Sequence, residues 1–165
     1  MTDFTEYKRL EIARIASNSA IVSPETAVAQ ACQTAVGVLV SDAATAGTAV
    51  TETVVLVAPY ALKVVSAKMA APIAVTASDT TYATVTVSTR SGAGGASTVA
   101  VMTTKTAGSG GSGSLVAFVP VAMTVTTTIL ATGDVLTLSI AKASTGVALC
   151  AATSYFAVEI VIEAV

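Results

Sequence analysis

Residues 82–90 read YATVTVSTR, and the two-residue rhythm of this stretch decides the fold class. Val85 and Val87 fall on one side of an extended chain, and small hydroxyl side chains fall on the other. Strict alternation of this kind predicts a strand with one buried face and one exposed face. Valine and threonine also suit the pleated surface of a sheet because they branch at Cβ.

The same rhythm recurs from about residue 51 to the last residue. Further strands are predicted over residues 51–58, 62–68, 97–104, 119–129, 135–142 and 155–165. The side chains expected to point inward are Val99 with Val101, Val121 with Met123 and Val125, Leu136 with Leu138 and Ile140, and Phe156 with Val158, Ile160 and Ile162. Small-residue turns separate these stretches at 77–79, 91–95, 107–114, 131–134 and 144–146. About seven to nine short strands predict a mainly β protein, an antiparallel β-sandwich for which the jelly roll is the best match.

The first residues differ in composition, and they predict a short N-terminal arm over 1–22 ahead of a β-sandwich domain over 23–165. Charge concentrates in this arm. Asp3 followed by Glu6 resembles a capping box, so a short helix is expected over about 3–16. A frayed terminus is the alternative.

Residues 23–37 predict a helical lead-in to the domain. Ser23 suits an N-cap, Pro24 suits the first helical position, and Gly37 can end a helix. Small residues recur four apart between them and would form a narrow face. Such a helix could lie flat on a sheet.

Charge is scarce, at 11% of the residues where about 25% is usual. The net charge of −2 gives no excess of positive charge for binding phosphates, so nucleic acid is not an expected partner. A membrane-spanning helix is not expected either, because the longest uncharged stretch contains a glycine–serine run and Pro120. A surface built largely from Thr, Ser, Ala and Gly suits close packing against other subunits.

The residues needed for most catalysis are missing. The chain has no histidine, which excludes an imidazole base, and Cys32 and Cys150 lie too far apart in sequence to form a metal-binding cluster. Neither glycine cluster has the lysine and following helix of a phosphate loop. We therefore expect no enzyme activity, no cofactor and no metal, and interpret the two cysteines as small buried residues.

Two further patterns resemble active-site motifs. Ser139 and Lys142 form an S-x-x-K spacing, but in a strand they would point to opposite faces. The conceivable paired carboxylates are Asp79, Asp134, Glu159 and Glu163. We interpret them as turn or surface charges.

Three phrases occur in order along the chain: ASDTTYATVTVSTRSGAGG at 77–95, LATGDVLTLSIAKASTGVAL at 130–149, and FAVEIVIEAV at 156–165. Together with a charged N-terminal segment, residues 50–165 resemble the capsid decoration and head-fibre proteins of tailed bacteriophages, which are built on β-sandwich domains. The resemblance implies a non-enzymatic homotrimer that is made in the host cytoplasm and binds the major capsid protein on the outer surface of the virion. The resemblance implies no catalytic residue in this chain.

The leading hypothesis is therefore a structural protein that stabilises a viral capsid. Because the arm combines charge with aromatic groups, the expected capsid contacts are Phe4, Tyr7, Arg9 and Arg14. The outward threonine and valine faces of the strands are expected to pack in the trimer. The alternative is a fibre- or adhesin-like β module that recognises glycans or proteins through its Gly/Ser-rich loops.

Overall fold

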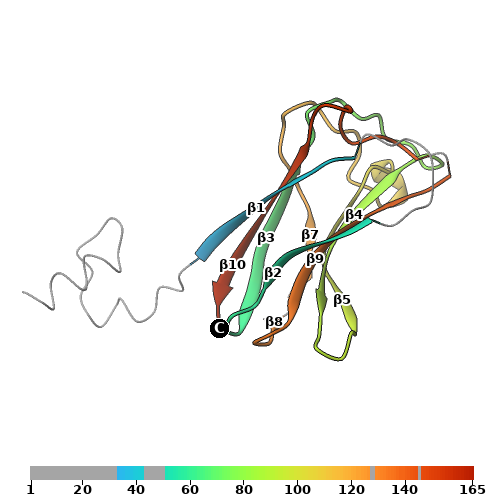
Figure 1. Cartoon of the computed structure of the whole chain (residues 1–165). Helices are drawn as coiled ribbons and strands as arrows, with labels where there is room; N and C mark the ends of the chain where they lie inside the picture. Colours follow the sequence, from blue (N-terminus) through green and yellow to red (C-terminus); the bar gives the residue numbers. More distant parts are fainter. Residues whose placement is uncertain (1–32, 43–50, 127–128, 145) are drawn as a thin grey trace, which may run out of the picture. The chain divides into compact units, whose positions relative to one another are not determined.

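Two antiparallel sheets pack face to face in the computed structural model (Figure 1). The structure describes residues 33–42, 51–126, 129–144 and 146–165. These residues belong to one compact unit, Gln33–Val165. The predicted β-sandwich is confirmed.

The sheets contain five strands each. The first sheet runs β1 (Gln33–Val40), β10 (Phe156–Ala164), β3 (Leu62–Ala70) and β6 (Val121–Ala122), and β8 (Ile129–Leu130) also pairs with β3. The second sheet runs β2 (Thr51–Val57), β9 (Val135–Lys142), β4 (Ala83–Arg90), β5 (Ala96–Thr103) and β7 (Thr124–Val125). A single 3₁₀ turn, η1 (Ala107–Ser109), lies among the described residues of the β5–β6 connection.

The strand order is that of a jelly roll. Early strands pair with late ones in a nested series: β1 with β10, β2 with β9, β3 with β6, and β4 with β5. Successive pairs belong to alternate sheets, as in a long hairpin rolled up on itself. The described residues contain more strands than expected because residues 121–130 form three strands of two residues each.

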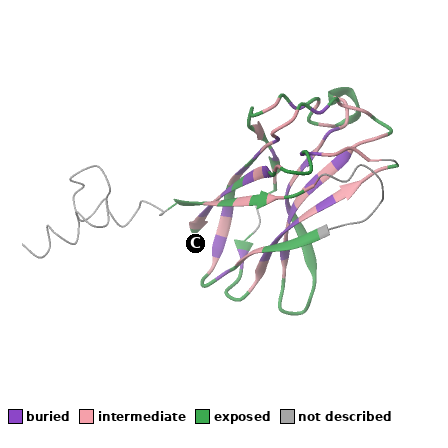
Figure 2. Cartoon of the chain, turned by 45° about the horizontal axis from the view of Figure 1, so that its top comes forward, coloured by how far each residue is buried: buried purple, intermediate pink, exposed green. Residues whose placement is uncertain are grey.

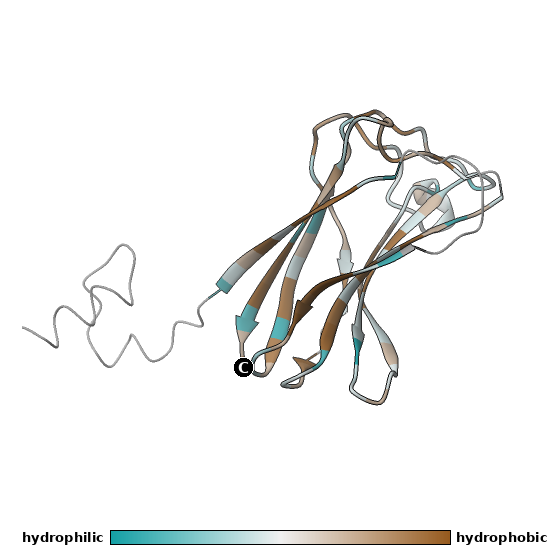
Figure 3. Ribbon diagram, viewed as in Figure 1, coloured by the Kyte–Doolittle hydropathy of each residue, from teal (hydrophilic) through white to brown (hydrophobic). Residues whose placement is uncertain are grey.

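The core consists of the side chains that alternation directs inward. Val85, Val87, Phe156 and Ile160 are completely buried, and Leu138 is almost so. Buried and less buried positions alternate along the central strands in Figure 2. The strands of both sheets also carry most of the apolar residues in Figure 3. Each fully buried valine, leucine or phenylalanine side chain contributes roughly 1.5–3 kcal/mol relative to exposure.

The helical lead-in predicted over 23–37 is wrong where the structure describes it. Residues 33–37 begin β1, and Gly37 lies opposite Glu159 in the middle of that strand instead of ending a helix. Val36, Val38 and Val40 pack against the core at a period of two, which overrides the small-residue helical pattern. The rest of that segment, and the helix expected over 3–16, lie outside the described residues.

The prediction that Val99 and Val101 both point inward is also wrong. Val99 and its neighbour Ala100 are both buried, whereas Val101 lies opposite Thr86, which faces outward. The β4–β5 register shifts between Val87 and Ser88, which is the signature of a β-bulge. One extra residue in β5 therefore reverses the direction of every later side chain.

The single strand predicted over 119–129 is divided between the two sheets. β6 pairs with β3 of the first sheet, and β7 pairs with β5 of the second. Met123 lies between them, is buried, and donates its backbone N–H to Ala67 O at 2.9 Å. The chain therefore crosses from one sheet to the other at Met123, while its apolar side chains still contact the core.

Candidate functional site

The outer face of the second sheet consists mostly of small side chains. Strand register and burial place on it Glu52, Val54, Val57, Thr84, Thr86, Ser88, Arg90, Ala96, Thr98, Val101, Thr103, Val135, Thr137, Ser139 and Ala141. Glu52 and Arg90 are the only charged members of this set. The face therefore offers methyl and hydroxyl groups to a partner and little charge that must be desolvated.

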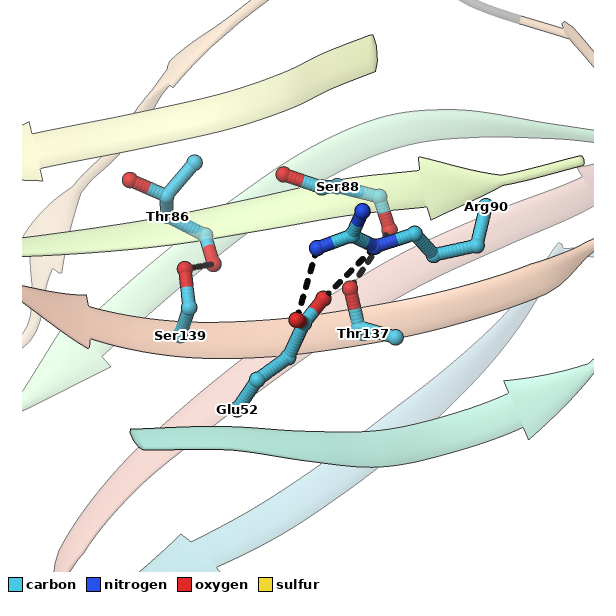
Figure 4. A network of polar contacts seen from close by, with 6 residues as sticks. All are labelled: Glu52, Thr86, Ser88, Arg90, Thr137 and Ser139. Carbon is cyan, nitrogen blue, oxygen red and sulfur yellow. Dashed lines mark hydrogen bonds and ion pairs between the residues drawn. The ribbon is translucent and has the colours of Figure 1, made fainter. Parts of the chain in front are cut away.

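Those two charged residues form an ion pair across the face (Figure 4). Arg90 lies on β4 and Glu52 on β2, with β9 between them. Arg90 Nε donates to Glu52 Oε1 at 2.9 Å, and Nη2 donates to Oε2 at 2.7 Å. This two-point hydrogen bonding by the guanidinium lowers the pKa of Glu52, with help from Thr137, and raises the pKa of Arg90. The face as a whole thus carries no net charge.

Some hydroxyls on this face bond to neighbouring strands. Thr137 Oγ1 donates to Ser88 O at 3.4 Å, and Ser139 Oγ donates to Thr86 O at 3.5 Å (Figure 4). Thr137 is 4% exposed although it lies on the outer face. The hydrogen bond from the Ser139 hydroxyl to a backbone carbonyl does not activate this hydroxyl as a nucleophile.

A second candidate surface is the loop that leads into β6. Phe118 is 77% exposed and Val116 is 61% exposed. Phe118 also has a φ of 61°, a left-handed conformation that non-glycine residues rarely adopt. Its backbone N–H donates to Ala71 O at 2.8 Å, which anchors the loop to the segment after β3. The result is an apolar tip on a fixed backbone.

A buried ion pair, which no sequence pattern predicted, connects the two sheets. Lys142 Nζ lies 2.8 Å from Asp42 Oδ1, and the two side chains are 5% and 10% exposed. The backbone N–H of Asp42 donates to Cys150 Sγ at 3.0 Å. This pair ties the end of β9 to the residues after β1. The prediction for the S-x-x-K motif is confirmed, because Ser139 points outward and Lys142 points inward from the same strand.

The conceivable catalytic carboxylates each have a structural neighbour. Asp79 Oδ1 accepts hydrogen bonds from Thr106 N at 3.0 Å and Thr106 Oγ1 at 2.9 Å, and these bonds lower the pKa of Asp79. Asp134 Oδ2 accepts from Ala131 N at 2.9 Å within one turn. The remaining two lie on the first sheet opposite lysines, Glu159 opposite Lys68 and Glu163 opposite Lys63.

The predicted capsid contacts Phe4, Tyr7, Arg9 and Arg14 lie outside the described residues, as does Cys32. Cys150 is a free, buried cysteine, as interpreted. In the part of the chain that the structure describes, no cluster of three or more His, Cys, Asp or Glu side chains could hold a metal ion. The same residues include no helix of the length and hydrophobicity needed to cross a membrane.

Comparison with known proteins adds no relative. No protein-family model matches the chain, and no curated protein is significantly similar to it.

Proposed function

We propose that this chain is a non-enzymatic structural protein that packs against copies of itself and binds the outer surface of a viral capsid. The observation that supports self-packing is the outer face of the second sheet, whose two charges neutralise each other. A surface of methyl and hydroxyl groups with little charge loses little solvation when a similar surface covers it. The proposed arrangement is the trimer that the resemblance to decoration proteins implies.

Binding to the shell is assigned to the N-terminal arm. Phe4, Tyr7, Arg9 and Arg14 combine aromatic and cationic groups in a segment that otherwise differs from the charge-poor domain. Aromatic and arginine side chains are the types most often enriched at protein interfaces. Three arms on one trimer would bind together, so the avidity of the trimer would exceed the affinity of any single arm.

The test compares the full chain with a chain that lacks residues 2–20. Light scattering gives the number of chains per particle, and sedimentation with undecorated shells of a tailed bacteriophage gives binding. The expected result is that both proteins form the same trimer but only the full chain sediments with shells. Lost trimerisation with intact shell binding would defeat this assignment of roles.

A second candidate function, recognition of glycans or proteins by a fibre-like module, is favoured by the exposed tip at Phe118. Aromatic side chains held in fixed positions are typical anchors for binding. A glycan array read with the full chain and with Phe118→Ala separates the two functions. Glycan binding that depends on Phe118, without any binding to shells, would favour the second function.

A further inference from the structure

The edges of the two sheets differ in how well they are protected from pairing with another chain. An open edge strand presents unpaired N–H and C=O groups, and proteins usually block it with a charge, a bulge or a short strand. Among the described strands, β2 has a bulge between Val54 and Leu56 and a charged side chain at Glu52. β6, β7 and β8 are two residues long.

β1 has none of these protections. Its eight residues, QTAVGVLV, contain no charge and no proline. Its register with β10 runs without a shift from Gln33 opposite Glu163 to Val40 opposite Phe156. Within the described ranges, β10 is the only strand that pairs with β1, so its other edge has no strand partner there. Leu39, on the outward side of β1, is 71% exposed, and the strand is exposed or half-buried along its length (Figure 2).

The sequence of β1 is nearly symmetric about Gly37. An antiparallel pair of β1 strands centred on this glycine would place Val36 opposite Val38, Thr34 opposite Val40, and Ala35 opposite Leu39. Val36, Val38 and Val40 pack against the core, so the pairing would continue the row of core valines from one copy into the next. On the outward side, the exposed Leu39 of one copy would cover Ala35 of the other.

Charge also permits this pairing. β1 itself brings no charge to the junction. The nearest charged residues on the adjacent strand, Glu159 and Glu163, lie opposite Lys68 and Lys63 of β3. The two copies of Glu159 would lie level with the axis but three strand spacings apart, about 14 Å, and each would have a lysine opposite it.

We infer that β1 pairs with β1 of a second copy of this chain, antiparallel and centred on Gly37, to join two five-stranded sheets into one. The pairing is separate from the trimer contact proposed above. If the chain forms trimers, the β1 pairing would connect two neighbouring trimers. If the chain does not form trimers, the β1 pairing would produce a dimer. The particle mass doubles for the dimer, and it doubles for trimers when all three β1 strands of one trimer pair with the three of its neighbour.

Gly37→Lys tests the pairing with little risk to the fold. A Cβ added at Gly37 would meet nothing within 4 Å, and lysine is compatible with an outward strand position beside Glu159. In the paired form, however, two ammonium groups would meet at the axis. The expected result in light scattering is half the particle mass of the unmodified chain. Val65→Lys is the matched control, because Val65 is 37% exposed on β3 of the same sheet, and β10 separates β3 from β1.

Cross-linking tests the register, with Cys32→Ser in every variant. Directly opposed residues of an antiparallel pair have Cα atoms about 4.5–5.5 Å apart, which a disulfide can span. Gly37→Cys should therefore cross-link to itself under mild oxidation. Ala35→Cys and Leu39→Cys should cross-link when the two variants are mixed, and much less when each is alone.

Several results would overturn the inference. Unchanged mass in Gly37→Lys, or no cross-link at Gly37→Cys in a folded protein, would show that β1 does not pair with itself in this register. Strong protection from hydrogen exchange of those β1 amides that point away from β10, in a Gly37→Lys monomer, would show that another part of the same chain covers the edge. Loss of shell binding with an intact cross-link would count against the proposed capsid function alone.

Discussion

At the scale of single residues, Gly111 shows how tightly the β5–β6 connection is packed. A Cβ at this position would collide with backbone atoms of Lys105, which cannot move away like the end of a flexible side chain. The Gly111 N–H also donates to Thr106 O at 3.0 Å. Only glycine fits this position.

Gly111→Ala should therefore lower the free energy of unfolding by about 1–3 kcal/mol, the usual cost of overpacking. Gly108→Ala is the control, because a Cβ there would meet nothing within 4 Å. Urea denaturation measures both variants. Equal stability of the two would mean that the loop does not hold the described conformation.

The ion pair between Lys142 and Asp42 provides a second prediction at this scale. Lys142→Ala leaves a buried carboxylate without its cation, and should lower the free energy of unfolding by about 3–5 kcal/mol. Lys63→Ala is the matched control, because Lys63 lies 3.8 Å from Glu163 and its side chain is 38% exposed. Loss of an exposed pair costs about 0–1 kcal/mol. Similar losses in both variants, measured by urea denaturation, would contradict the buried position of Lys142.

The dependence of stability on pH follows from Asp79 and Glu52. Hydrogen bonds from Thr106 lower the pKa of Asp79 below its ordinary value of 3.8, and Arg90 lowers the pKa of Glu52 below 4.5. A lowered pKa in the folded state means that the unfolded state binds protons first as the pH falls. The stabilisation from both groups is thus fully present above the ordinary values, and it is lost as the pH falls through the folded values.

In the double variant Asp79→Asn and Glu52→Gln, stability should decrease less steeply as the pH is lowered. Melting temperatures measured from pH 7 down to about pH 3 test this expectation, because the unfolded chain takes up protons on the two carboxyl groups near their ordinary pKa values of 3.8 and 4.5. An acid-side slope equal to that of the unmodified chain would show that these hydrogen bonds are absent in solution.

At the scale of secondary structure elements, the bulge in β5 changes which side chains of this strand point inward, compared with the strict alternation expected from the sequence. Val99 is completely buried, whereas Val101 faces outward opposite Thr86. Val99→Thr should lower the free energy of unfolding by about 1–3 kcal/mol, because it buries a hydroxyl. Val101→Thr should change it by less than about 0.5 kcal/mol. The reverse order in chemical denaturation would contradict the bulge.

The sequence predicted strands well wherever hydrophobic and polar residues alternate strictly. β4, β9 and β10 were predicted because each has a clear apolar face, with Val85, Leu138 and Ile160 as examples. β1 was missed because small residues spaced four apart resemble a helix and Gly37 resembles its end. The bulge at Val99 could not be predicted, because it depends on the register with β4.

At the scale of the whole molecule, alternation predicted which side chains of β4 and β9 would form an outer face. It could not predict the contacts between distant residues. Glu52 and Arg90 meet only because β9 lies between β2 and β4. Asp42 and Lys142 meet because the jelly roll brings the end of its first strand to the end of its ninth. Such pairs depend on topology, which a single sequence does not display.

The number of chains per particle shows whether this charge-poor sandwich packs against copies of itself. Light scattering from the full chain over a range of concentrations measures it directly. We expect particles of three chains, and of six where two trimers also pair through all of their β1 strands. A mass equal to one chain at every concentration would contradict it.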